Sequence, residues 1–417
     1  MASMSSPHVL IAGGGVSGLC LAQGLRKQGI SCAVYEREPA NTQRAGYRLT
    51  MNADGGEALR ACLPEDLYEL YLQTSRQTPR RQLAVVIDSQ CNELTTQEHL
   101  GPPNEGPRPH TAIDRRTLRQ IMLGRLGDAV TPGVSATGFD ADADGVRLHL
   151  SDGSAVEGDL LVGADGIGSP IRRQLLPGAQ VVEADVTASL GLFARSPLTP
   201  EIVAELPEIL WDGFVIARDD QGAMLALGAY VPRQPVAEAA AAIAPDVPVE
   251  PVGDYMMISG GVARGVHVPE TADWTAGTAE QVRDGMVRAV ADWHPALRGL
   301  VERLDPGTLF GLRFGRLEPT PAWEPSRVTV MGDAIHAMLP TRGQGANMAL
   351  RDARVLSEQL GAAARGERPL LEAIGAYEQD MRDYVYPIMD LSADHSRYGG
   401  GGLRTGAPAG AGTSATT

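Results

Sequence analysis

Three glycines near the N-terminus have the types and spacing of a phosphate-binding loop. Gly13, Gly15 and Gly18 follow the pattern G-x-G-x-x-G between an apolar run and a helical pattern. In such a loop the first glycine permits a tight turn, the second lets the backbone approach a pyrophosphate, and the third lets the helix pack closely. The helix N-terminus, with Val16 and Ser17 at its start, would face the phosphate charge. The pattern therefore predicts a dinucleotide site.

An acidic residue stands where such a site needs one. Glu36 directly follows the next apolar run, Ser31–Tyr35, eighteen residues past Gly18. Its carboxylate is placed to hydrogen-bond an adenosine ribose without a 2′-phosphate, and Arg37 beside it is a further candidate. The alternative is a glycine-rich turn that binds nothing. On these residues alone, the dinucleotide could be NAD or FAD.

Two further strand-like runs end in an aspartate beside a glycine. Asp165 and Gly166 end the run DLLVGADG, and Gly332 and Asp333 end RVTVMGD. After the second pair, residues 340–347 form a glycine-containing loop that leads into a long helical pattern. A glycine loop at a helix N-terminus presents N–H groups and a positive dipole end to negative charge. An NAD dehydrogenase of this length needs neither device, so the sequence favours FAD.

Composition excludes several function classes. The 417 residues carry a formal net charge of −15, which argues against a nucleic-acid partner and against docking on an anionic membrane. No apolar run approaches the ~18 residues that a membrane span needs, and no signal peptide is recognisable. The four cysteines form no C-x-x-C pair, so we expect no metal site. We expect a cytoplasmic protein that is a monomer or a homodimer.

The elements that must position these residues follow from the hydrophobic pattern. It predicts a β–α–β unit at the N-terminus, a strand–loop–helix near the C-terminus, and an irregular, strand-like middle. We therefore predict an α/β fold in which a mixed-sheet substrate domain is inserted into a discontinuous, Rossmann-like FAD-binding domain with C-terminal helices. The FAD-binding domain comprises residues 1–75, 105–182 and 291–398, the substrate domain residues 76–104 and 183–290. The tail, residues 399–417, is predicted to be disordered because it has few apolar groups.

The three motifs, in this order and spacing, resemble those of the FAD-dependent aromatic hydroxylases, the single-component flavoprotein monooxygenases that include para-hydroxybenzoate hydroxylase. The resemblance covers about residues 8–185 and 290–395, and the middle matches only in rough size and position. The cofactor-binding residues that it implies, together with Arg37, are Gly13, Gly15, Val16, Ser17, Gly18, Glu36, Arg44, Arg115, Asp165, Gly166, Gly332, Asp333, Pro340, Gly343, Gly345, Ala346 and Asn347.

The resemblance also distributes these residues along the cofactor. The first glycine loop and Glu36 would hold the ADP half, and Arg115 would lie near the pyrophosphate. Asp333 would bind the ribityl chain, and residues 340–347 would lie beside the isoalloxazine ring. The two glycine devices would then grip opposite ends of one FAD.

The function implied by the resemblance is that of a monooxygenase with non-covalently bound FAD. NADPH or NADH would reduce the flavin, O₂ would add at C4a, and the hydroperoxide would deliver oxygen to an electron-rich aromatic or polyketide-like small molecule. Baeyer–Villiger, epoxidase and alkene-reductase chemistry on the same fold stay open, as does an FAD-binding sensor. A halogenase lacks support because its G-W-x-W-x-I-P signature is missing, and a dithiol-linked reductase because no C-x₄-C pair follows the first unit.

No catalytic acid–base pair is evident in the sequence, which leaves two candidates for contact with the substrate. Arg48 follows the flavin-side loop, where many relatives have glycine, and could meet an anionic substrate. The alternative is a surface or FAD-phosphate arginine. Tyr230 is the second candidate, with a buried core tyrosine as the alternative. His336 is interpreted as a structural histidine, and Asp212 has no assigned role.

Overall fold

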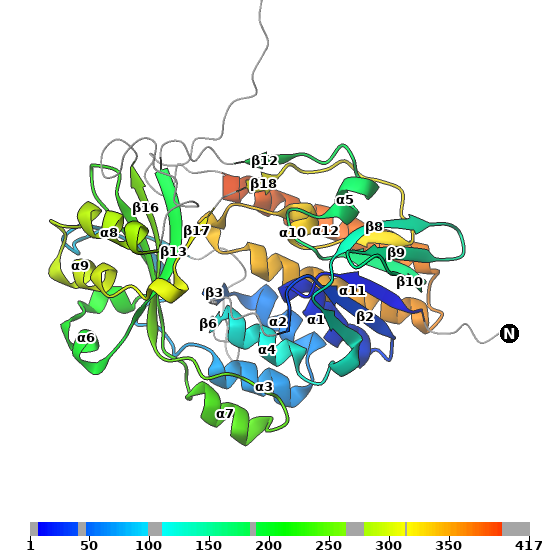
Figure 1. The fold of residues 1–417 in the computed structure, drawn as a ribbon, viewed down its shortest axis with the longest axis horizontal. Coiled ribbons are helices and arrows are strands. Elements are labelled where there is room, and N and C mark those ends of the chain that lie inside the picture. The colour runs from blue at the N-terminus through cyan, green and yellow to red at the C-terminus, as the bar shows by residue number, and fades with distance from the viewer. Residues whose placement is uncertain are drawn as a thin grey trace, which may run out of the picture.

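The computed structural model describes residues 7–40, 47–98, 111–183, 189–263, 279–312 and 315–393. Arg44 and the predicted tail, residues 399–417, lie outside the described residues. Figure 1 shows two bodies side by side, one with a parallel sheet and the long C-terminal helices, the other with a larger sheet. Among the described residues, no helix is both long and apolar enough to cross a membrane.

The first body is built on a five-stranded sheet whose neighbouring strands are all parallel. Its order is β19 (Val328–Val330), β11 (Leu160–Gly163), β1 (Val9–Ala12), β2 (Cys32–Glu36) and β7 (Val130–Pro132). The three predicted motifs directly follow β1, β11 and β19. Because the carboxyl ends of parallel strands meet at one edge, the topology brings these motifs together.

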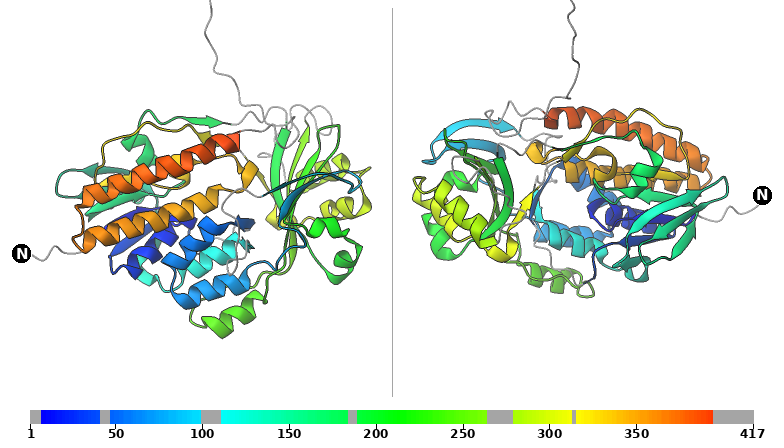
Figure 2. Two further views of the ribbon diagram at one scale, coloured as in Figure 1. Left: turned by 180° about the vertical axis from the view of Figure 1, so that it is seen from behind. Right: turned by 45° about the horizontal axis from the view of Figure 1, so that its top comes forward.

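Helices cover the five-stranded sheet, and two of them begin at the predicted glycine loops. The central pair is α1 (Val16–Lys27) and α11 (Gly345–Ala364), which pack against each other. The helix α12 (Leu370–Ala393) lies along α11, as Figure 2 shows. Gly29, which follows the last turn of α1, has φ +73°, a conformation that favours glycine and ends the helix.

The remaining elements of this body surround the sheet. They are β3 (Arg48–Met51) paired with β6 (Thr111–Asp114), α2 (Ala53–Cys62), α3 (Glu65–Thr74), α4 (Arg115–Leu123), the antiparallel β8 (Ala136–Ala141), β9 (Val146–Leu150) and β10 (Ala155–Gly158), α5 (Pro170–Leu175), β12 (Val181–Glu183) paired with β18 (Gly315–Leu317), and α10 (Asp333–His336).

The second body is a seven-stranded sheet in the order β17 (Phe310–Leu312), β13 (Ser189–Pro197), β16 (Tyr255–Ala263), β15 (Met224–Tyr230), β14 (Phe214–Arg218), β4 (Leu83–Asp88) and β5 (Glu93–Glu98). It is mixed, because β14 pairs parallel with β4 and the other neighbours are antiparallel. The predicted fold, a Rossmann-like domain with an inserted mixed sheet and C-terminal helices, is therefore confirmed.

The two faces of the larger sheet differ, as alternation along each strand requires. One face packs in an aliphatic core with α6 (Pro200–Glu205), α8 (Ala279–Ala289) and α9 (Pro295–Glu302). The other face gathers aromatic side chains, namely Phe193, Phe214, Tyr230 and Tyr255. Figure 1 shows α8 and α9 on the side of the sheet away from the first body. The aromatic face is therefore the one turned toward the parallel-sheet body.

The predicted domain boundaries remain a proposal, and three elements pack with the body other than the one to which their residue numbers assign them. The helix α9 and the strand β17, assigned to the FAD-binding domain, join the core and the sheet of the second body. The alanine-rich α7 (Val236–Ile243), assigned to the substrate domain, packs instead against α3 of the first body.

Candidate cofactor and substrate site

The first glycine loop has the geometry that its spacing predicts. Gly13 has φ +107°, and a Cβ there would lie 2.4 Å from the carbonyl oxygen of Ala164. A Cβ on Gly18 would lie 2.0 Å from the carbonyl oxygen of Gly13, whereas one on Gly15 would meet nothing within 4 Å. The tight turn at Gly13, the open backbone at Gly15 and the close approach of the helix at Gly18 are thus present in the predicted order.

The helix α1 begins at this loop with its N–H groups uncommitted. Its N-cap is Gly15, and the described residues supply no side-chain cap and no acid in the first turn. Free N–H groups at a helix start are an anion site. Nearby, the buried Glu36 accepts hydrogen bonds from the N–H of Gly14 at 2.6 Å and of Glu38 at 2.8 Å. Glu36 thus fixes the loop, while its contact with a ribose stays a prediction.

The loops after β1, β11 and β19 lie against one another. Gly332 has φ +60°, and a Cβ there would lie 3.0 Å from Oγ of Ser17 in α1. Arg172, which is 2% exposed, donates to the carbonyl oxygens of Ile167 at 2.7 Å and Ala334 at 2.9 Å. That guanidinium fastens the loop after β11 to α10. The start of the second device, at Gly332, therefore lies against the helix that follows the first glycine loop, more than three hundred residues away in the sequence.

Asp165, just after β11, has a buried carboxylate with few hydrogen bonds. Neither buried carboxylate oxygen has a well-formed hydrogen bond to the described residues. Burial raises the pKa of Asp165, although the Ser169 hydroxyl and the N–H of Ile171 face the carboxylate closely enough to lower the pKa in part. The following Gly166 has φ +81°. Buried polar atoms in native proteins are nearly always hydrogen-bonded. A polar ligand at this edge of the sheet would supply the hydrogen bonds that the Asp165 carboxylate can accept.

The second glycine loop leads into α11 in the same way. Gly343 has φ +63°, and the helix start after Gln344 has no side-chain cap among the described residues. A Cβ on Gly345 would lie 3.9 Å from Oδ1 of Asp333. Asp333, like Pro340, is exposed. The start of α11 and the Asp333 carboxylate therefore lie side by side, and their division between ring and ribityl chain stays a prediction.

Behind this loop, two buried side chains anchor Gly332. Oδ2 of Asp352 accepts hydrogen bonds from the N–H of Gly332 at 2.9 Å and from Nε2 of His336 at 2.6 Å. Both side chains are 0% exposed. Burial lowers the pKa of His336, but the charge of Asp352, the hydrogen bond to Asp352 and the charge of Asp333 together outweigh burial, so the pKa is raised. This arrangement agrees with a structural His336, and it adds Asp352, which sequence reasoning missed.

Comparison with known proteins places this geometry in a family. The family described as "FAD binding domain" matches residues 7–241 and 299–392. The chain belongs to this FAD-binding family. The cofactor that its loops accommodate is FAD, and the open helix starts and the buried carboxylate of Asp165 fit that group.

Individual relatives are similar over most of this chain. The "Dual O-methyltransferase/FAD-dependent monooxygenase elcB" of Phaeosphaeria nodorum is 29% identical over 421 residues, which cover 95% of this chain but 45% of that protein. The chain thus spans less than half the length of that relative. The "FAD-dependent urate hydroxylase" of Klebsiella pneumoniae is 28% identical over 91% of this chain and 87% of that protein.

Among solved structures, a variant of HpxO from Klebsiella pneumoniae complexed with FAD is similar. It has a TM-score of 0.70 and 25% identity, and the match covers 93% of this chain and 88% of that chain. The likeness therefore extends through both bodies of the molecule.

Two arginines of α4 lie on the side of the FAD phosphate loop. Nε of Arg119 donates to the carbonyl oxygen of Gly14 at 3.1 Å. Arg115, one turn earlier, lies with Cζ 5.8 Å from the centroid of the Tyr47 ring. Residues four apart share a helix face, so Arg115 starts from the same face of α4 as Arg119, and its contact with the pyrophosphate stays a prediction. Arg119 was missed, because the resemblance assigned only Arg115.

Asn347 ties the ring-side loop to β3. Its Nδ2 donates to the carbonyl oxygens of Thr50 at 2.9 Å and Gly343 at 3.0 Å, and its Oδ1 accepts from the N–H of Asn52 at 2.9 Å. The amide is thus committed to backbone groups, and a direct contact with FAD stays a prediction. Asn52, which also caps α2, is, after Asp352 and Arg119, a third residue that sequence reasoning missed.

On the substrate side, a buried carboxylate joins the two bodies. Oδ2 of Asp114 accepts hydrogen bonds from Nη2 of Arg195 at 2.6 Å and from the hydroxyl of Tyr255 at 2.9 Å. Next to this network, the Tyr47 and Phe193 rings stack with centroids 5.0 Å apart. The network and the ring pair fix β13 and β16 beside β3 and β6.

The two substrate candidates are both buried. The hydroxyl of Tyr230 donates to the carbonyl oxygen of Thr74 at 2.7 Å, and burial raises its pKa, which agrees with the alternative of a core tyrosine. Arg48 is 5% exposed, so the alternative of a surface arginine is wrong. Its guanidinium is turned inward, between β3 and the larger sheet, because it bonds the carbonyl oxygen of Gly213 at 2.8 Å.

Proposed function

We propose that the chain is an FAD-dependent monooxygenase that uses NADPH or NADH and O₂ to hydroxylate an electron-rich aromatic or polyketide-like small molecule. One observation carries the proposal. The ring-side loop of the FAD site and the aromatic face of the larger sheet are joined through β3, by Asn347 on one side and Arg48 on the other. A substrate held between them would lie next to the reacting ring.

When bound, FAD supplies the redox chemistry, namely oxidation of the nicotinamide and activation of O₂ at C4a. The residues expected to hold it are those of the three loops, with Glu36 at the adenosine end and Asp333 at the ribityl chain. The N-terminus of α11 would face the N1–C2=O edge of the ring. A positive dipole end there stabilises negative charge on that edge.

The larger sheet would supply the substrate environment. Phe193 and Phe214, the partly exposed rings of its inner face, would offer apolar, flat contact surface for a ring-shaped substrate. The same packed surface would exclude bulk water from the reacting atoms, which prevents side reactions. The hydroxyls of Tyr230 and Tyr255 are already committed to protein acceptors, so we assign neither a proton-transfer role.

The test is isotopic. Purified protein with NADPH or NADH, ¹⁸O₂ and a panel of phenols, quinones and polyketides should give a product heavier by one labelled oxygen. Label from H₂¹⁸O would overturn the proposal. A labelled lactone or ester would favour Baeyer–Villiger oxidation, a labelled epoxide the epoxidase, and reduction of substrate under nitrogen the alkene reductase. Absence of nicotinamide oxidation with every compound would favour a non-enzymatic FAD protein.

A further inference from the structure

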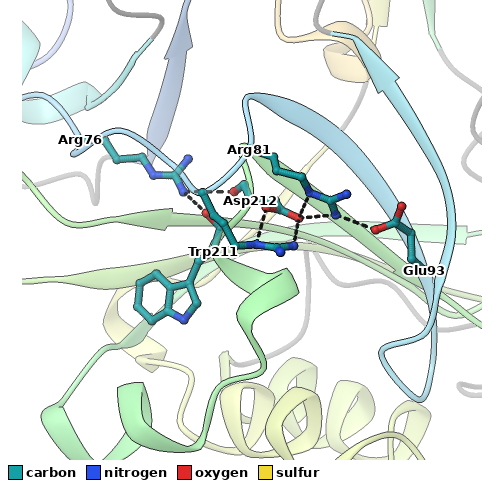
Figure 3. Close-up of polar contacts among 6 residues, drawn as sticks. Arg76, Arg81, Glu93, Trp211 and Asp212 are labelled. Atoms are coloured by element: carbon teal, nitrogen blue, oxygen red, sulfur yellow. Dashed lines mark hydrogen bonds and ion pairs between the residues drawn. The ribbon is translucent and has the colours of Figure 1, made fainter.

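Four arginines gather around one turn of the larger sheet. The turn, residues 211–213, joins the short helix η2 (Glu208–Trp211) to β14. Arg76, Arg80 and Arg81 come from the segment between α3 and β4, and the fourth arginine, Arg48, comes from β3. Figure 3 shows Arg76 and Arg81 converging on Trp211 and Asp212.

Three of these arginines hold the turn rigidly. Asp212, which is 0% exposed, accepts Nε and Nη2 of Arg80 at 3.0 and 2.9 Å and Nε and Nη2 of Arg81 at 3.1 and 2.8 Å. Arg76 donates to the carbonyl oxygens of Trp211, Asp212 and Gly213 at 3.2, 3.1 and 3.0 Å. Forked guanidinium contacts of this kind fix orientation as well as distance. We call Arg76, Arg80, Arg81 and Asp212 the Asp212 clamp.

The clamp presents one carbonyl oxygen to Arg48. Nη2 of Arg48 donates to the carbonyl oxygen of Gly213 at 2.8 Å, the same oxygen that Arg76 bonds. Nη1 donates to Oγ1 of Thr50 at 3.1 Å. Nε of Arg48 is buried without a hydrogen-bond partner among the described residues. A guanidinium has five N–H donors, so this side chain has donors to spare.

Charge around Arg48 is unbalanced. Asp212 already pairs with Arg80 and Arg81, and Glu93 also pairs with Arg81 at 2.6 Å. Arg48 itself forms no ion pair with any described residue, although it is 5% exposed. A buried cation without an anion is costly to maintain. The site therefore has the electrostatics of an anion receptor.

The place of Arg48 says which anion would reach it. The Cβ of Thr50, its hydrogen-bond partner, lies 3.8 Å from where a Cβ on Gly343 of the ring-side loop would be. On the opposite side, a Cβ on Gly228 of β15 would lie 2.9 Å from Nη1 of Arg48. The guanidinium thus lies between the loop expected to hold the flavin ring and the sheet expected to hold the substrate.

We propose that Arg48 recognises an anionic oxygen of the substrate, a carboxylate or an ionised hydroxyl on a flat ring, and that the Asp212 clamp positions Arg48 for this contact. The inference rests on the proposed function, because it places the substrate beside the flavin loop. It makes Arg48 the specificity-determining residue and Asp212 a positioning residue.

The test is a binding titration that needs no turnover. Oxidised holoenzyme is titrated at pH 7 with 3-hydroxybenzoate and with its neutral match 3-hydroxybenzamide, and binding is followed by the flavin absorbance. Wild type should bind the carboxylate at least tenfold more tightly than the amide. Arg48→Gln should weaken carboxylate binding about tenfold to a hundredfold, the effect of losing charged hydrogen bonds. Its affinity for the amide should change less than threefold.

Three further variants separate the contributions. Arg298→Gln removes the same charge from an exposed position on α9 and should leave both affinities unchanged. Gly228→Ala, which displaces the guanidinium but keeps its charge, should weaken carboxylate binding selectively, and it serves also if Arg48→Gln does not fold. Asp212→Asn should do the same through the clamp, with FAD content retained.

The outcomes decide the matter separately from the proposed function. A wild type that binds the carboxylate no better than the amide, including one that binds neither, overturns the inference. So does an Arg48→Gln variant that keeps the preference. Loss of the preference in Arg48→Gln but not in Asp212→Asn overturns the role of the clamp alone. Failure of the monooxygenase proposal would instead show as absent nicotinamide oxidation in an enzyme that still binds the carboxylate selectively.

Discussion

Replacement of Asp352 by asparagine should loosen the ring-side half of the FAD site from behind. In the wild type, Oδ2 of Asp352 accepts hydrogen bonds from the N–H of Gly332 and from Nε2 of His336 in a fully buried setting. An amide oxygen can keep one of these bonds, but the charge is lost. Removing one partner of a buried pair costs about 3–5 kcal/mol. Since asparagine keeps the shape, we expect about 2–4 kcal/mol of unfolding free energy to be lost.

The loss should depend on pH with a defined sign. The pKa of His336 is raised in the folded protein, so its pairing stabilises the fold fully below the ordinary histidine pKa of about 6.5. That contribution disappears as the pH rises through the folded-state pKa. The difference between wild type and Asp352→Asn should therefore be larger at pH 6 than at pH 9.

The assay is urea unfolding of the FAD-free protein at both pH values. Asp284→Asn is the matched control, because Asp284 is 55% exposed and its ion-pair partner Arg283 is 33% exposed, and an exposed pair contributes about 0–1 kcal/mol. An Asp352→Asn variant within about 1 kcal/mol of wild type at pH 6, or a difference that grows toward pH 9, would refute the reasoning.

Three further perturbations test other parts of the structure. Burial raises the pKa of Glu378 from 4.5 to about 7, so its charge destabilises the folded state as the pH rises from 4.5 to 7. Glu378→Gln should therefore increase the free energy of urea unfolding by about 1–3 kcal/mol at pH 8 and by little at pH 5. An equal increase at both pH values would contradict this. Gly18→Ala should lower both the melting temperature and the FAD content, because its Cβ would lie 2.0 Å from the carbonyl oxygen of Gly13. Gly15→Ala should weaken FAD binding and leave the melting temperature of the FAD-free protein unchanged. Equal melting temperatures for the two variants would contradict the loop geometry. Tyr255→Phe should cost about 1.5–3 kcal/mol in urea unfolding, because it removes a hydrogen bond to the charged Asp114; an unchanged midpoint would show that the interbody network does not stabilise the fold.

Local pattern predicted the parts of the fold that depend on neighbours in sequence. The glycine loop, the first helix with Gly29 beyond its end, and the start of α11 at Gly345 follow from periodicity and from residues with special backbone conformations. The helix α2 was not predicted. Its segment ADGGEALRAC contains two glycines, and packing against α11 stabilises it despite that low propensity.

Side-chain partners far apart in sequence could not be predicted. Asp114 and Arg195 are 81 positions apart and Arg80 and Asp212 are 132 apart, so no local pattern links them. The sequence marked Asp212 without giving it a role, and only the fold shows that it organises three arginines. In the same way, the sequence does not show that Arg48 is buried, because its neighbours, Gly228 of β15 and the turn at Gly213, are far from it along the chain.

The central claim is that two glycine loops hold opposite ends of one FAD, and calorimetric titration of the FAD-free protein with FAD and with ADP tests it most directly. Glu36→Ala should weaken both ligands by about 1.5–3 kcal/mol, because the adenosine end is common to them. Asp333→Ala should weaken FAD by a similar amount and leave ADP within twofold of wild type. Unchanged FAD affinity in both variants, or equal loss of ADP affinity in both, would contradict the claim.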